Sequence, residues 1–221
     1  MRAAIFDLDG TLADTSADLL NAANVVLEPE GLPLLTLERD KSFAGRGARE
    51  MLRRSLSFVG RGPDDPAVDR LYQPFLEAYA QALAVETHLY DGVVACLDRL
   101  EADGWRIGVC TNKPEGLALQ VLEALDVRHR FPAILGADTL PVRKPDPEHL
   151  IETARRIGAD PARAVMIGDT LTDLSTARHA GVPCVLTSFG FAAQPLSELA
   201  PDAIVDHYDE IPPLLDRLSP A

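Results

Sequence analysis

The strongest constraint on the fold is an alternation between short apolar runs and segments whose apolar residues recur every three or four positions. The runs are too short for helices and are apolar throughout, which is typical of strands buried on both faces of a parallel sheet. They predict strands over Ala3–Phe6, 106–111, 133–136, Ala164–Gly168, 183–187 and Ala203–Val205. Helical segments between these strands predict an α/β fold with a doubly wound parallel sheet.

A second region, residues 15–87, interrupts this alternation. It contains helical apolar stripes, such as Leu19, Ala23 and Val26, and has no strand pattern between them. Pro74 falls inside the longest stripe, where we expect a kink. The simplest interpretation is an α-helical domain inserted after the first strand of a sheet domain that comprises residues 1–14 and 88–221.

Composition excludes several classes of partner. The 221 residues carry a net charge of −13 and contain no long basic cluster, so we expect neither nucleic-acid nor anionic-membrane binding. No transmembrane run is present, and the apolar start is too short for a signal peptide, which predicts a cytoplasmic protein. Three widely separated cysteines, Cys96, Cys110 and Cys184, are expected to be reduced thiols. A monomer or a homodimer is equally compatible with the sequence.

Polar residues follow several of the predicted strands directly. Ligands of open α/β sheets bind beyond the carboxyl ends of the strands, so these residues are expected to gather at one edge. They are Asp7, Asp9 and Thr11 after the first strand, Thr111 and Asn112 after the second, Asp169 and Asp173 in "GDTLTD", and Lys144 in the loop "VRKPDP".

A hard cation would explain so many neighbouring carboxylates, because unpaired acids repel one another and Mg²⁺ prefers oxygen ligands. Lys144 and Thr111 would then face an anion bound to that cation, and a phosphoryl group fits. Taken singly, Thr111 could be a helix N-cap and Lys144 a surface lysine. A calcium loop is excluded, because Leu12 and Asp18 stand where that loop needs glycine and glutamate.

The motifs "DLDGT", "CTNKP", "RKPDP" and "GDTLTD" together resemble the four motifs of the haloacid dehalogenase superfamily of phosphotransferases. The resemblance covers nearly the whole chain, and the helical insert matches the small cap of that superfamily. More narrowly, "TNKP", "GDTLTDLSTARHAGV" and the cap segment "FAGRGAREMLRRSL" are similar to phosphoglycolate phosphatases.

The resemblance implies a Rossmann-like core and covalent catalysis. Asp7 would attack phosphorus in line to give an aspartyl-phosphate. Asp9 would protonate the leaving alkoxide and then deprotonate the hydrolytic water. The catalytic set would therefore be Asp7, Asp9, Thr111 and Lys144.

The resemblance also implies a Mg²⁺ site and an anion site. The candidate metal residues are Asp7, Asp9 through its backbone carbonyl, Asp169, and Asp173 as a ligand or water-bridged partner. Thr111, Asn112 and Lys144 would hold the phosphoryl oxygens, while Arg46 and Arg49 of the cap are candidates for reading a substrate carboxylate. The cap would close over the substrate and set its identity.

The expected activity is therefore Mg²⁺-dependent hydrolysis of a small phosphate ester, with 2-phosphoglycolate as the first candidate. Sugar phosphates, nucleotides and pyrophosphate remain rival substrates. A non-enzymatic alternative is a receiver-like module, because response-regulator receivers also combine paired acids, Thr and Lys at strand ends. The cap after the first strand and the greater length argue against that alternative.

Overall fold

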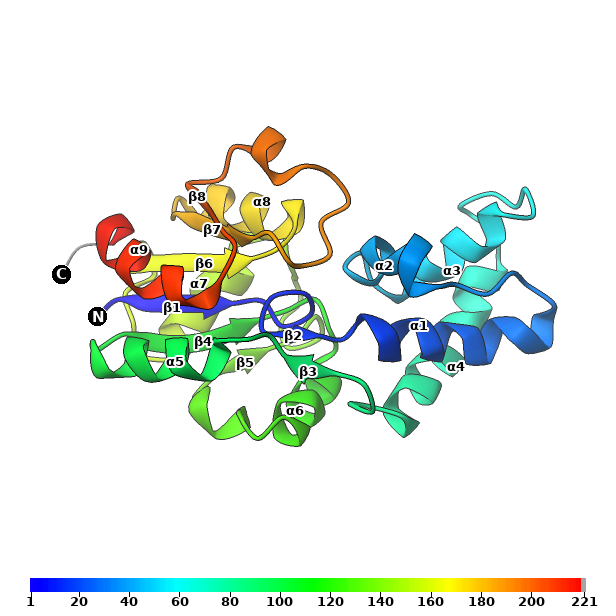
Figure 1. Cartoon of the computed structure of the whole chain (residues 1–221), viewed down its shortest axis with the longest axis horizontal. Helices are drawn as coiled ribbons and strands as arrows, with labels where there is room; N and C mark the ends of the chain where they lie inside the picture. The colour runs from blue at the N-terminus through cyan, green and yellow to red at the C-terminus, as the bar shows by residue number, and fades with distance from the viewer. Residues whose placement is uncertain (220–221) are drawn as a thin grey trace. The chain divides into compact units, whose positions relative to one another are not determined.

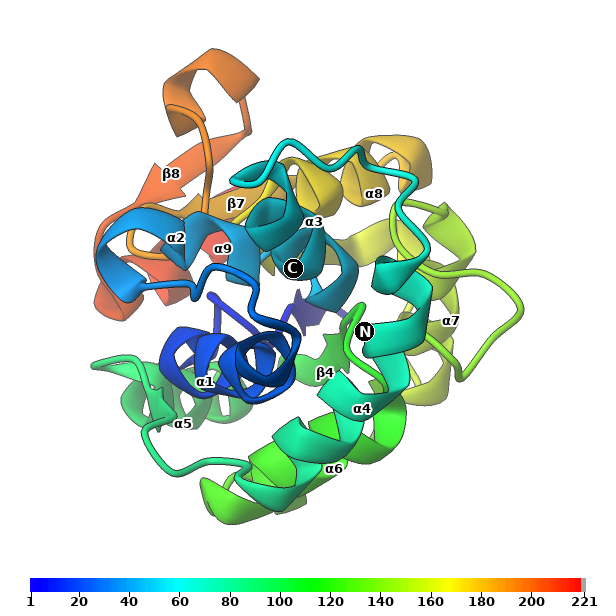
Figure 2. The same ribbon diagram turned by 90° about the vertical axis from the view of Figure 1, so that its right-hand side faces the viewer.

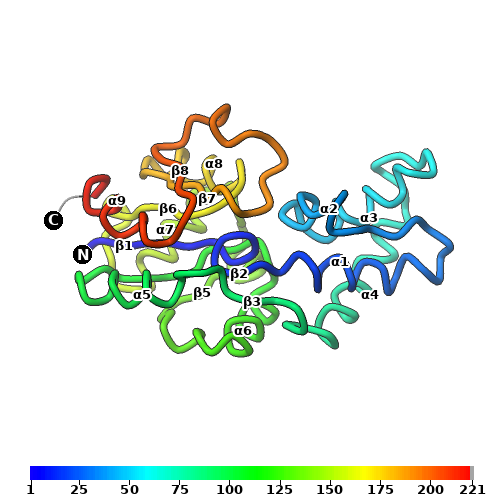
Figure 3. Tube along the Cα trace, in the orientation of Figure 1, coloured from blue at the N-terminus to red at the C-terminus, as the bar shows by residue number. Residues whose placement is uncertain are grey.

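The computed structural model describes residues 1–219, which separate into two compact units. Within the described residues, one unit comprises 1–13 and 89–219 and contains the main sheet, and the other comprises 14–88 and is helical. Figure 3 traces the chain as it leaves the sheet unit once and returns once.

The sheet unit is built on six parallel strands in the order β5-β4-β1-β6-β7-β8. Their bounds are β1 Ala3–Phe6, β4 Arg106–Cys110, β5 Ile134–Leu135, β6 Ala164–Gly168, β7 Cys184–Thr187 and β8 Ala203–Val205. The first two strands out from the centre, β4 and β6, both pair with β1, so the chain winds outward in both directions from the middle of the sheet. The predicted α/β class with a doubly wound parallel sheet is confirmed.

Helices cover both faces of this sheet (Figure 1). α7 (Pro147–Arg156) and α8 (Leu171–Ala180) pack against each other and against β1, β4 and β6, while α5 (Val93–Ala102) and α9 (Ile211–Leu218) pack together on the other face. α6 (Glu115–Ala124) follows β4 and lies beside β5. Ile5 of β1 and Leu150 of α7 are fully buried in one core cluster, which explains why the strands are apolar throughout.

The helical unit consists of α1 (Ser16–Leu27), α2 (Leu37–Ala44), α3 (Ala48–Ser57) and α4 (Ala67–Gln81). α1 packs along α4 and also contacts α2 and α3 (Figure 2). The expected apolar stripes face this interior: Leu19 and Val26 of α1 and Phe75 of α4 are buried. α4 continues through Pro74, and the kink expected there stays a prediction.

The sequence pattern does not predict two very short strands. β2 (Ala13–Asp14) and β3 (His88–Leu89) form a separate two-stranded sheet at the two places where the chain passes between the units. Each has two residues, too few for an alternation of polar and apolar side chains to be recognised. Among residues 1–219, no helix is long and apolar enough to cross a membrane. All three cysteines are free and buried.

Candidate active site

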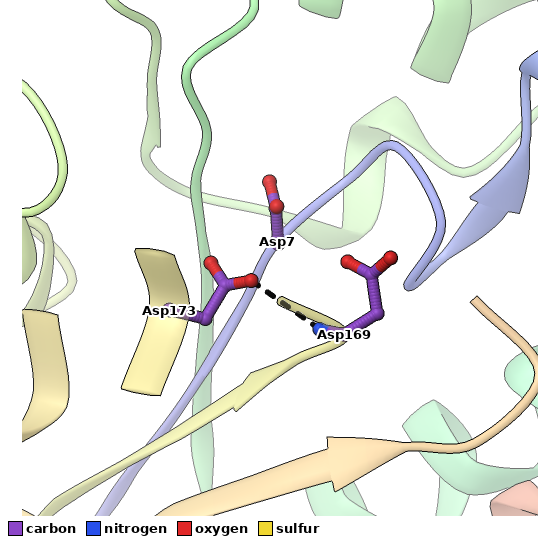
Figure 4. A group of neighbouring side chains, drawn as sticks. All are labelled: Asp7, Asp169 and Asp173. Atoms are coloured by element: carbon purple, nitrogen blue, oxygen red, sulfur yellow. Dashed lines mark hydrogen bonds between the residues drawn. The ribbon is translucent and has the colours of Figure 1, made fainter. Parts of the chain in front are cut away.

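Three carboxylates gather at the carboxyl edge of the main sheet. Asp7 follows β1, Asp169 follows β6, and Asp173 lies in the first turn of α8 (Figure 4). One carboxylate oxygen of each lies within 4.8 Å of the other two, and all three residues are buried. These acids come together because β1 and β6 are hydrogen-bonded parallel neighbours, which places their carboxyl ends side by side.

Lys144 supplies a positive charge to this group. Its Nζ lies 2.9 Å from Asp7 Oδ2 and 2.6 Å from Asp173 Oδ1, and only 1% of its side chain is exposed. Burial disfavours the charged ammonium, but Asp173 and Asp7 outweigh it and raise the pKa of Lys144 above its usual value. Lys144 therefore stays charged.

The acids themselves are poorly neutralised by one ammonium. Burial raises the pKa of Asp7 from its usual 3.8 to about 6, with Lys144 opposing the shift and Asp173 adding to it. The pKa of Asp169 is also raised well above its usual value, by burial and then by repulsion from Asp173 and Asp7. Further positive charge would relieve this repulsion.

The donor set fits Mg²⁺. It consists only of carboxylate oxygens, the ligands that a hard divalent cation prefers. Asp169 is held in place by the backbone N–H of Phe191, which donates to Oδ2 at 2.6 Å, and by Thr11, which donates to Oδ1 at 3.2 Å. Gly10 allows this approach: its φ is +81°, and a Cβ there would lie 2.3 Å from Asp169 Oδ2.

Besides contacting Lys144, the Asp173 carboxylate caps the start of a helix. Its Oδ2 accepts hydrogen bonds from the backbone N–H groups of Asp169 and Thr170 and from the Thr170 hydroxyl, at 3.3, 3.1 and 2.7 Å. These bonds form a capping box that starts α8. One carboxylate here combines helix capping with a place in the acid group.

The residues after β4 complete this edge. Thr111 is buried, and its N–H donates to Leu135 O at 2.9 Å. The Asn112 amide donates to the backbone carbonyl of Lys144 at 3.0 Å, which ties the lysine loop to the end of β4. The Asp9 carboxylate is not in the acid group, and its Oδ1 pairs with Lys113 Nζ at 2.9 Å.

Residues 4–187 match the sequence profile of the haloacid dehalogenase-like hydrolase family. The chain belongs to this family. It is 40% identical over 207 residues to a protein named phosphoglycolate phosphatase from Mesorhizobium japonicum, with 94% of this chain and 91% of that protein covered. A protein of the same name from Caulobacter vibrioides is also 40% identical, with 94% and 87% covered.

A solved structure whose fold matches this chain bears the same protein name as the sequence relatives. A crystal structure described as a predicted phosphoglycolate phosphatase from Haemophilus somnus superimposes with a TM-score of 0.87 at 26% identity and covers 97% of both chains. The similarity extends over nearly the whole chain, so the resemblance of the short motifs reflects membership of the haloacid dehalogenase-like family.

Sequence reasoning gave no role to two buried residues near this edge of the sheet, Lys113 and His149. Lys113 belongs to the quoted "TNKP", yet only its neighbours Thr111 and Asn112 were given a role. The available signal was rarity: the chain has only three lysines, and this one follows a strand directly. His149 could not have been found, because the five histidines have no recognisable ligand spacing.

His149 contacts groups at the carboxyl ends of β4 and β5. It is fully buried, its Nε2 donates to Gly136 O at 3.0 Å, and its Nδ1 lies 3.4 Å from Cys110 Sγ. Burial, and then the nearby Lys144, lower its pKa from 6.5 to about 4. The folded protein therefore keeps His149 neutral over a pH range in which the unfolded chain protonates it.

This difference predicts an acid-sensitive contribution to stability. Because the unfolded state binds more protons at His149 between pH 6.5 and 4, the contribution of His149 to the free energy of unfolding must fall as the pH drops through that window. Between pH 7 and 5 we expect His149→Gln to lose about 2 kcal/mol less than the wild type does, measured by urea unfolding in chelator. His129→Gln, at an exposed position, serves as the control. Equal losses in the wild type and His149→Gln would refute the assignment.

Proposed function

We propose that the chain is a Mg²⁺-dependent phosphomonoester hydrolase that works through an aspartyl-phosphate, with 2-phosphoglycolate as its substrate. The observation that carries the proposal is the position of Asp7: a buried carboxylate at the centre of the sheet edge, 2.9 Å from the Lys144 ammonium and beside two further acids. The relatives named phosphoglycolate phosphatase support the substrate.

In the first step an Asp7 carboxylate oxygen attacks phosphorus, forming a P–O bond as the bond to the leaving alkoxide breaks. Asp9 gives its proton to that alkoxide, which departs as glycolate. In the second step Asp9 takes a proton from water, whose oxygen attacks the same phosphorus and restores the Asp7 carboxylate. Atoms and charges balance over the cycle, which yields an alcohol and inorganic phosphate.

Lys144, Thr111 and Asn112 would hold the phosphoryl oxygens during both steps. Lys144 is suited to this because it is buried and charged, so its attraction for the added negative charge is little screened. Asp7, Asp169, the backbone carbonyl of Asp9 and, directly or through water, Asp173 would hold Mg²⁺. When bound, Mg²⁺ supplies positive charge that keeps Asp7 ionised and polarises the phosphoryl group.

Arg46 and Arg49 remain proposed readers of a substrate carboxylate. In the helical unit Arg49 pairs with Asp69 and stacks over Tyr72. Arg46 stacks over Phe43 and, among residues 1–219, forms no ion pair with a carboxylate. Arg46 is the better candidate, since recruiting it would break no ion pair of the described chain.

The deciding experiment is a turnover screen over phosphate esters, pyrophosphate and nucleotides, with Mg²⁺ and with excess chelator. We expect 2-phosphoglycolate to have the highest kcat/KM and chelation to lower it at least about 1000-fold, because the acids lose their neutralising cation. Added Mg²⁺ should restore the activity.

Three outcomes would contradict parts of this proposal. Full activity in chelator would remove the metal. A sugar phosphate or pyrophosphate that exceeds 2-phosphoglycolate tenfold would change the substrate but keep the reaction. Stoichiometric phosphorylation of the chain without turnover would favour the receiver-like alternative. Cytoplasmic location and a monomeric or dimeric state stay predictions.

A further inference from the structure

The sheet unit contains a second buried lysine, and the proposed chemistry leaves it without a role. Lys113 has 3% of its side chain exposed, and its Nζ lies 2.9 Å from Asp9 Oδ1. Lys144 has a comparable position beside Asp7. Two of the three lysines in the chain are therefore buried at the site, one beside each aspartate of "DLDGT".

The fold fixes Lys113 closely. Its backbone N–H donates to Thr111 Oγ1 at 3.2 Å, and its carbonyl accepts from Ala137 N at 3.0 Å. The segment lies directly against Gly136, where a Cβ would meet the Lys113 carbonyl oxygen at 2.7 Å and Glu115 N at 2.3 Å. Backbone bonds on both sides and this close packing fix the backbone position from which the Lys113 side chain reaches Asp9.

The two ammonium groups lie beside carboxylates with different proposed roles. Lys144 faces the nucleophile, where the phosphoryl group must lie, and Lys113 faces the proposed proton shuttle, where the leaving oxygen must lie within hydrogen-bond distance. A phosphoryl group alone would need only the first of these cations and the metal. The second ammonium fits a leaving group that carries its own negative charge.

We infer that Lys113 binds the carboxylate of the leaving group and makes the enzyme select a phosphorylated 2-hydroxy acid over an uncharged phosphate ester. This inference rests on the proposed function and adds Lys113 to Arg46 as a proposed reader of the substrate carboxylate. In 2-phosphoglycolate a single methylene separates the ester oxygen from the carboxylate, so a cation in contact with Asp9 is within reach of both. An ammonium has three donors and can keep one on Asp9 while another binds the carboxylate.

The test compares 2-phosphoglycolate with ethyl phosphate, which has a methyl group where the carboxylate stands. In the wild type, kcat/KM should favour 2-phosphoglycolate. In Lys113→Met this preference should fall about 10- to 100-fold, the range for losing a hydrogen bond between charged groups. Most of the loss should appear in KM for 2-phosphoglycolate.

Two further variants separate substrate reading from a structural role. Arg130→Met is the matched control: it removes a largely buried cation that pairs with Asp98 and Glu101 of α5 in the same unit, and the preference should remain unchanged. Lys113→Arg keeps the charge and should retain more of the preference than Lys113→Met. Glycolate should inhibit ethyl phosphate hydrolysis by the wild type and do so at least tenfold more weakly in Lys113→Met.

The outcomes are distinct. If Lys113→Met and Lys113→Arg slow both esters by the same factor and glycolate inhibition is unchanged, Lys113 only positions Asp9 and the inference is overturned, while the proposed function stands. If Lys113→Met does not fold, the rates with the two esters and the inhibition by glycolate are compared between the wild type and Lys113→Arg, and the same outcome overturns the inference. A wild type without preference for 2-phosphoglycolate would overturn the proposed substrate and, with it, this inference.

Discussion

Replacing Asp7 by asparagine should abolish turnover, lowering kcat by about 10⁴-fold or more, because an amide cannot form the acyl-phosphate that the proposed mechanism requires. The measurement is steady-state hydrolysis of 2-phosphoglycolate at saturating Mg²⁺, together with a search for phosphorylated protein after rapid quenching. The wild type should trap phosphate covalently, and Asp7→Asn should not.

The same substitution should not destabilise the metal-free protein. Burial and repulsion raise the pKa of Asp7 from 3.8 to about 6, so its ionised form costs the folded state about 3 kcal/mol at pH 8. This cost is absent at low pH and develops as the pH rises from about 4 to 6. In chelator at pH 8, Asp7→Asn should therefore be at least as stable as the wild type, and the difference should disappear below pH 4.

Asp160→Asn provides the control for both measurements. Asp160 caps a short helical turn before β6 by accepting a hydrogen bond from Ala162 N, and its replacement should leave turnover unchanged. Retained turnover in Asp7→Asn would exclude Asp7 as the nucleophile. A variant that is inactive because it is unfolded would contradict the stability argument instead.

Lys144→Met should damage both stability and activity. It removes an ammonium that is 1% exposed and contacts Asp7 and Asp173. Breaking a buried ion pair from one side typically costs about 3–5 kcal/mol, because the partner charge is left uncompensated. Loss of a positive charge beside the transferring phosphoryl group should lower kcat by a further factor of about 10²–10³.

A pH comparison tests whether the loss of stability is electrostatic. At pH 5 the unpaired Asp7 carboxylate can take up a proton, so the difference in unfolding free energy between wild type and Lys144→Met should be smaller than at pH 8. A difference that is independent of pH would indicate lost packing. Arg155→Met, which removes an exposed cation paired with Glu148, should change neither quantity.

Much of the sheet unit could be predicted because its strands are apolar on both sides and short. Ala3–Phe6, Ala164–Gly168 and Ala203–Val205 were predicted with the bounds that the structure has, and β4, β5 and β7 differ by one residue at one or both ends. The differences fall at strand ends, where pairing with a neighbouring strand decides the last residue. β5 pairs through only Ile134 and Leu135, which no local pattern specifies.

The candidate site divides in a similar way. The positions of Asp7, Thr111 and Asp169 follow from the rule that ligands bind beyond the carboxyl ends of parallel strands, which needs only the strand assignments. The contacts of Asp9 and Lys113 do not follow, because they join residues 104 positions apart in the chain. The double use of the Asp173 carboxylate also depends on the position that Lys144 reaches from a separate loop.

By itself the sequence determined the α/β class, the helical insert and the chemical types that meet at the sheet edge, because hydrophobic periodicity and motif spacing are local properties of the chain. Only the tertiary structure decided which cation faces which acid. It set Lys144 against Asp7 and Asp173, and Lys113 against Asp9, through the hydrogen bonds of loops that follow different strands. Charge pairing acts over a few ångströms in space, and a sequence does not record those distances until the chain is folded.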